Sequence, residues 1–211
     1  MDRVAIKEQA KKMIKDNKWY IWKPLVFVEL IIFAILFVIG FILGILKVDE
    51  NTMTIIVGIL SFFVGLFESA FMIGYAKYVL EFTRGNKMEW KETINYAKSH
   101  LGIAIITSLL VGLIIIGCSI LLVIPGIIAA IGLLFYQEVI ADNEDLSATE
   151  VIKIAWNITK GHKMDLFVLI LSFIGWEILA SFTLGILYIW LVPYMQVSLL
   201  LAYESLKKKT I

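Results

Sequence analysis

The chain has 211 residues, of which 60% are hydrophobic, and a mean hydropathy of +0.89. A soluble domain is typically about 45–50% apolar, so a water-facing globule of this length could not bury the excess, whereas a protein surrounded by lipid need not. The net charge of +1 excludes a global field that would attract nucleic acid, and the single cysteine, Cys118, excludes an internal disulfide and a multi-cysteine metal site.

The sequence predicts an all-α, polytopic membrane bundle of six transmembrane helices in three hairpins. About two dozen mostly polar residues precede the first apolar run, which favours a retained first span over a cleavable signal. Crossing a bilayer takes about 20 mainly apolar residues. The expected spans cover residues 25–46, 53–75, 101–116, 119–141, 166–182 and 185–201, with outer turns at 47–52, 117–119 and 183–185.

The positive charges predict the orientation of the spans. Of the 19 lysine and arginine residues, all but Lys47 fall before the first span, between spans two and three, between spans four and five, or after the last span. The positive-inside rule then places both termini in the cytoplasm. Trp19, Tyr20 and Trp22 are typical of an inner aromatic belt at the start of the first span.

A cytoplasmic amphipathic helix is expected before each hairpin. Ser147 and Glu150 form a capping box at the start of the third one, and Gly161 is a suitable stop. Such helices could lie in the headgroup layer or cap the spans. The apolar stripes are Ile6, Ala10, Met13 and Ile14; Trp90, Ile94, Ala97 and Leu101; and Val151, Ile154, Ala155 and Ile158. The pattern predicts one transmembrane domain, residues 1–211, with pseudo-repeats at about 1–80, 86–141 and 147–206.

Two prolines follow a glycine by eight residues in the second and third units. Pro125 and Pro193 are expected in the outer part of a span, where each frees a carbonyl one turn earlier, at Leu121 and Ile189. That carbonyl must find a partner or line a cavity, so the alternatives are a packing kink and a binding site. Small-residue pairs predict close helix contacts. These pairs are Gly40 with Gly44, Ala70 with Gly74, and Gly126 with Ala130.

Two acidic residues are predicted near the bilayer midplane. Glu68 and Glu177 lie about 13–16 Å along the helix axis from the inner ends of their spans, too deep for their carboxylates to reach the headgroups. Glu29 and Glu138 lie nearer the inner surface and could reach it. The alternatives for the deep pair are a polar clamp between hairpins and a proton or cation relay. The acidic run that begins at Asp142 is interpreted as a solvated loop.

Several short segments carry a resemblance to a known family. They are Pro125-Gly126, Ala141-Asp142-Asn143, Ser147-Ala148, Gly161-His162-Lys163, Ser172-Phe173-Ile174-Gly175-Trp176 and Pro193-Tyr194. Their order resembles the uncharacterised bacterial integral-membrane family known as domain of unknown function nine-seven-five. That family is distantly similar to the membrane domain of glycerophosphodiester phosphodiesterases. The resemblance implies the fold and a bacterial plasma-membrane location, and it carries over no catalytic residue.

No enzymatic motif such as HExxH, a Walker loop, GxGxxG or GxSxG occurs. We therefore expect no enzyme, cofactor or metal, and interpret His100 and His162 as interfacial anchors. The favoured function is a non-catalytic membrane protein acting through lipid or protein partners, including further copies of itself, as an envelope accessory factor or an immunity protein against a membrane-active peptide. The alternatives are a small transporter or channel that uses the midplane acids, and a protein of a lipid pathway.

Overall fold

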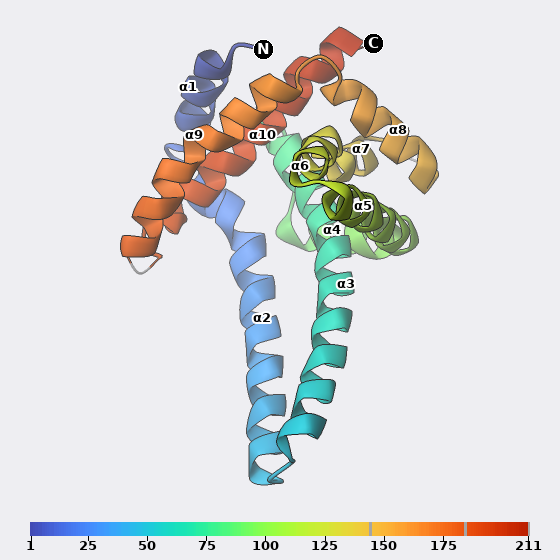
Figure 1. The fold of residues 1–211 in the computed structure, drawn as a ribbon. Helices are drawn as coiled ribbons and strands as arrows, with labels where there is room; N and C mark the ends of the chain where they lie inside the picture. Colours follow the sequence, from blue (N-terminus) through green and yellow to red (C-terminus); the bar gives the residue numbers. More distant parts are fainter. Residues whose placement is uncertain (144, 184, 211) are drawn as a thin grey trace.

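The computed structural model describes residues 1–143, 145–183 and 185–210, and these contain helices and turns but no strand (Figure 1). The order short helix, span, span occurs three times. The first unit has α1 (Arg3–Ile14), α2 (Lys18–Ile45) and α3 (Glu50–Thr83); the second has α4 (Trp90–Ser99), α5 (Leu101–Leu121), α6 (Val123–Gly132) and α7 (Tyr136–Asp142); the third has α8 (Ala148–Thr159), α9 (Lys163–Phe182) and α10 (Tyr188–Thr210). With α6 and α7 taken together, six segments are long and apolar enough to cross a membrane, which confirms the multi-pass class and implies contact with the bilayer.

The turns of the first and third hairpins lie where the sequence predicts them. Between α2 and α3, the Asp49 side chain accepts a hydrogen bond from the Thr52 N–H at 3.0 Å and so caps α3. After α9, Gly185 has a φ of +84°, a left-handed conformation that favours glycine. Leu184, inside the predicted turn, is outside the described residues.

The second hairpin turns later than predicted. Residues 117–119 are helical and belong to α5, and the chain reverses at Leu122, whose backbone is extended. Pro125 therefore sits in the first turn of α6, where a missing N–H costs no helical hydrogen bond, and does not kink a continuous span. Gly126 fits this corner because a Cβ there would lie 2.1 Å from the Ser119 Oγ.

The fourth span is broken rather than continuous. Residues 133–135 form a turn between α6 and α7, and within it Leu133 and Phe135 are buried. The Thr159 hydroxyl of α8 donates a hydrogen bond to the Gly132 carbonyl at 2.9 Å. The break is thus held by a side chain from another unit, which satisfies a carbonyl at the end of α6.

The three amphipathic helices pack on other helices of the protein. Their apolar faces are buried against other helices: α1 packs on α10, α4 on α3, and α8 on α5, α7 and α10. The capping box of Ser147 and Glu150 is present at the start of α8. In α4 the buried residues are Ala97, which belongs to the predicted stripe, and Thr93, which does not; Gly74 of α3 admits the Thr93 backbone.

The core lies at the ends of the hairpins nearest the two chain termini, which we call the inner ends, and the hairpins diverge from it. In Figure 1 the α2–α3 hairpin extends away from the other helices, and the two chain termini lie at the opposite end of the molecule. Buried residues stop at Val28 in α2 and resume only at Ala70 in α3. Gly40 and Gly44 have open space beside them, so this small-residue pair makes no close contact within the chain. By contrast, Gly74 makes a close contact with α4, and Gly126 makes one with Ser119 of α5.

The start of each hairpin has similar backbone geometry. The residues before α2, α5 and α9 are Asn17, His100 and His162, with φ between −107° and −121° and ψ between 9° and 15°. His100 stacks on the Tyr96 ring, with centroids 4.0 Å apart, and His162 Nδ1 lies 3.2 Å from the Asp165 carboxylate. Both histidines therefore mark the junction between an amphipathic helix and a span.

Candidate functional site

Asp142 is the centre of a group of charged side chains at the inner end of the helices. Its Oδ1 lies 2.7 Å from Arg84 Nη2, and its Oδ2 lies 2.5 Å from Lys207 Nζ and 3.0 Å from the Tyr203 hydroxyl. The Asp142 side chain is 5% exposed, so the sequence-based interpretation of a solvated loop is wrong at this position. A carboxylate with this burial requires the opposite charges that surround it.

The second acid of the group, Glu204, accepts from Arg84 Nε at 2.8 Å. We call Arg84, Asp142, Tyr203, Glu204 and Lys207 the inner ionic cluster. Burial opposes the charge on Arg84, but the hydrogen bonds to Asp142 and Glu204 outweigh it and raise the pKa of the guanidinium. Two cations balance two carboxylates, so the cluster can stay ionised without a bound ion.

The inner ionic cluster joins all three units. Arg84 follows α3, Asp142 ends α7, and Tyr203, Glu204 and Lys207 belong to α10. Each of these positions is the inner end of the second span of its hairpin. The outer halves of the hairpins diverge. A change in the relative position of the hairpins would therefore alter the ion pairs at this junction.

One turn before Asp142, Glu138 is buried in the core. It is 8% exposed, and its Oε2 has no hydrogen-bond partner among the described residues. The expectation that this side chain reaches the inner surface is wrong, because the break at 133–135 turns α7 toward α3 and places Glu138 inward. An acid buried without a partner is costly, which makes it a candidate for proton or ion binding.

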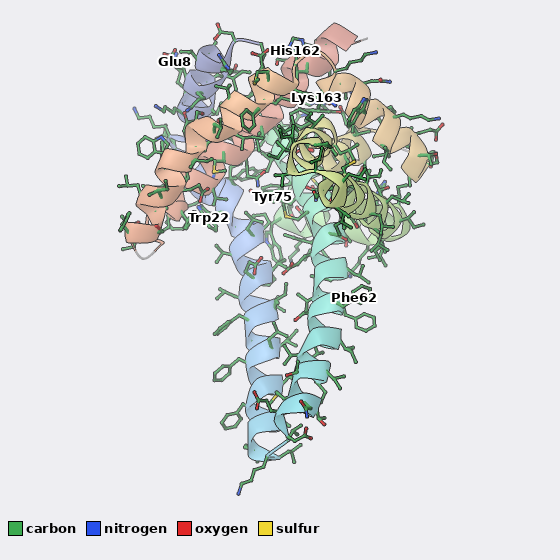
Figure 2. The ribbon with its side chains drawn as sticks, in the orientation of Figure 1. Glu8, Trp22, Phe62, Tyr75, His162 and Lys163 are labelled. Atoms are coloured by element: carbon green, nitrogen blue, oxygen red, sulfur yellow. The ribbon has the colours of Figure 1, made fainter. Side chains whose placement is uncertain are left out.

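Aromatic donors satisfy the carbonyls that two prolines free. Pro193 leaves the Ile189 carbonyl without its helical partner, and the Trp22 Nε1–H donates to it at 2.6 Å, so of the two expected outcomes this carbonyl has a partner. Pro24, inside α2, has the same effect on Tyr20, whose carbonyl accepts from the Tyr78 hydroxyl at 2.9 Å. These bonds make both prolines packing features. Figure 2 shows Trp22 where α2 meets the α9–α10 hairpin.

The structure does not bring Glu68 and Glu177 together. Glu68 interacts electrostatically with Glu29 of its own hairpin, and Glu177 with Tyr188 of its own hairpin. Both side chains are half-buried. No hydrogen bond or ion pair joins the two acids in the part of the chain that the structure describes, so nothing there supports a cation shared between them.

Comparison with known proteins places the chain in a family. A family described as "Protein of unknown function (DUF975)" matches residues 104–210, which is half of the chain. The chain belongs to this family. The matched region of this DUF975 protein includes the discontinuous fourth span, Glu138 and most of the inner ionic cluster. No curated protein and no solved structure matches the chain.

Sequence reasoning missed the inner ionic cluster because its members are far apart in the chain. Arg84 and Glu204 are separated by 120 residues, and the local sequence around each predicts a solvent-exposed helix end. The available signal was Tyr203, because a tyrosine in the apolar part of a helix needs a partner for its hydroxyl. The partners themselves follow only from the packing.

Proposed function

We propose that this protein is a non-catalytic component of the bacterial plasma membrane, with both termini in the cytoplasm, that acts through membrane or protein partners. The proposal rests on the separation of polar and apolar side chains between the two ends of the hairpins. Its described polar groups mostly bind one another at the inner end, while the outer halves of the hairpins expose large apolar side chains. A surface of this kind suits lipid or another transmembrane helix and offers a soluble substrate no polar contact.

The α2–α3 hairpin shows this separation most clearly. Phe33 and Phe37 of α2 are 67% and 63% exposed, and Phe62 and Phe63 of α3 are 58% and 62% exposed. Figure 2 shows Phe62 projecting away from α2. Aromatic side chains of this size supply large contact areas in a helix–helix interface. An envelope accessory factor and an immunity protein against a membrane-active peptide would both use such a face.

A deletion strain distinguishes these roles from transport. We expect the deletion to raise sensitivity to membrane-active peptides or to disturb envelope assembly, and complementation by the wild-type gene to restore both. A complementing gene with Phe33→Ala and Phe62→Ala removes exposed rings of the proposed face, leaves the core intact and should fail to restore either property. Wild-type peptide sensitivity and envelope integrity in the deletion strain, together with altered uptake of a solute, would contradict the proposal.

The orientation has its own test. In a Cys118→Ser background, Asn51→Cys places a thiol at the predicted outer turn and Lys87→Cys places one in the predicted cytoplasmic connection, and both native side chains are exposed. A membrane-impermeant maleimide should label the first variant in intact cells and the second only after permeabilisation. Labelling of both in intact cells, or the reverse order, would contradict cytoplasmic termini.

A second candidate function, a small transporter or channel, draws on the broken fourth span and on Glu138. Discontinuous spans often lie beside ion or substrate sites, and Glu138 is a buried acid a few residues beyond the break. Gln at Glu138, Glu68 or Glu177 keeps the shape but cannot ionise. Ion flux in proteoliposomes that is lost in Glu138→Gln and retained in Glu68→Gln would favour transport through α7 over a relay at the midplane.

A further inference from the structure

An apolar groove runs along α6 where the first turn of α9 crosses it. The lining residues are Ile124, Ile127, Ile128 and Ile131 from α6, with Lys163, Met164 and Phe167 from α9. The isoleucines are spaced i, i+3, i+4 and i+7, so they form one face of the helix. The groove has a volume of about 470 Å³, within the range of about 300–1,000 Å³ of small-ligand sites.

One cation borders this groove: Lys163 lines it with the apolar stem of its side chain. The Lys163 Nζ lies over the Trp156 ring, 2.9 Å from its centroid, and Figure 2 shows Lys163 beside the helices of the second unit. Gly132 makes room for both side chains, because a Cβ there would lie 2.9 Å from the Lys163 Nζ and 2.3 Å from the Trp156 ring. Three helices, α6, α8 and α9, therefore fix the position of the ammonium group.

The fixed ammonium group lacks an anion. Across residues 1–143, 145–183 and 185–210, no carboxylate forms an ion pair with Lys163 and no acceptor takes a hydrogen bond from it. The nearby acid Asp165 is instead engaged with His162 and Arg3. An ammonium group has three donors, and a cation–π contact satisfies none of them.

We propose that this groove binds one anionic phospholipid, with an acyl chain along the isoleucine face of α6 and the phosphate on the Lys163 ammonium group. The isoleucine face extends over about 10 Å at 1.5 Å per residue, along which part of an acyl chain can lie. Lys163 begins α9, so the proposed topology places it at the cytoplasmic leaflet, which carries the anionic lipids. The site goes beyond the proposed function, which requires no particular lipid.

A phospholipid fits the groove better than the other occupants. A soluble anion would leave the apolar lining open, and an apolar helix from a second copy would leave the ammonium group without an acceptor. A phospholipid alone brings an apolar chain and a phosphate on one molecule. The phosphate of either headgroup accepts charge-assisted hydrogen bonds. A zwitterionic headgroup also carries a cation that opposes the Lys163 ammonium group, so an anionic headgroup should bind more tightly.

The test uses the full-length protein in a mild detergent, with native mass spectrometry to measure binding of phosphatidylglycerol and phosphatidylcholine. We expect phosphatidylglycerol to bind more tightly, and Lys163→Gln to weaken that binding about tenfold, as the loss of one charge-assisted bond implies. Lys160→Gln, an exposed cation of the same connection, is the matched control and should bind as the wild type does. Lys163→Arg keeps the charge and should retain most of the affinity.

A variant in the groove tests the position of the acyl chain. Ile128→Trp fills the isoleucine face and should weaken phosphatidylglycerol binding while thermal stability stays near that of the wild type, because Ile128 is 45% exposed. Equal loss in Lys163→Gln and Lys160→Gln would overturn the proposal, as would equal binding of the two lipids. Displacement of the lipid by millimolar inorganic phosphate would mean a site for a soluble anion, and binding suppressed only by dimer formation would mean a protein interface.

Discussion

Replacing Asp142 by asparagine removes the central charge of the inner ionic cluster and keeps the size of the side chain. Breaking a buried ion pair typically costs about 3–5 kcal/mol, because the remaining partners stay desolvated. Arg84 would retain Glu204, but Lys207 would lose its carboxylate. The side chains of Arg84 and Lys207 are 31% and 25% exposed, so water screens part of this loss and we expect Asp142→Asn to lower the free energy of unfolding by about 2–3 kcal/mol.

Thermal unfolding of the purified protein in detergent measures this loss. For a chain of this length, about 2–4 °C per kcal/mol predicts a Tm lower by roughly 4–12 °C. Asp145→Asn is the matched control, because Asp145 is exposed in the same connection and forms no ion pair that the structure records. Its Tm should match that of the wild type. Indistinguishable Tm values for Asp142→Asn and Asp145→Asn would refute a stabilising role for the cluster.

Two further substitutions test close contacts between units. Gly74→Ala should destabilise the protein by about 1–3 kcal/mol, because the new Cβ would lie 2.2 Å from a backbone oxygen of α4. Gly65→Ala, which has open space beside it, is the control and should leave the stability unchanged. Equal Tm values for the two variants would count against the α3–α4 packing. Trp22→Phe removes the donor to the Ile189 carbonyl that Pro193 frees, so it should lower the Tm. Trp19→Phe is the control and should lower the Tm less, because Trp19 is 63% exposed. The reverse order of the two Tm values would contradict this role for Trp22.

The local sequence determined features that depend on neighbouring residues. Apolar runs of about 20 residues predict spans because each buried peptide group must bond within its own helix in lipid. The capping box at Ser147 and the glycine stop at Gly161 act within a few residues, and both occur as predicted. The need of the Ile189 carbonyl for a partner was also readable, since a proline four residues later removes its usual donor.

Contacts between distant residues were decided only by the tertiary structure. The pairing of Arg84 with Glu204, the break before α7 and the inward position of Glu138 all depend on how three hairpins meet, and no local pattern encodes that meeting. The separation of Glu68 from Glu177 has the same origin. Depth along a span can be counted in residues, but the direction a side chain faces depends on the rotation and tilt that neighbouring helices impose. The sequence therefore determined which segments enter the membrane, and packing at their inner ends determined which polar groups meet.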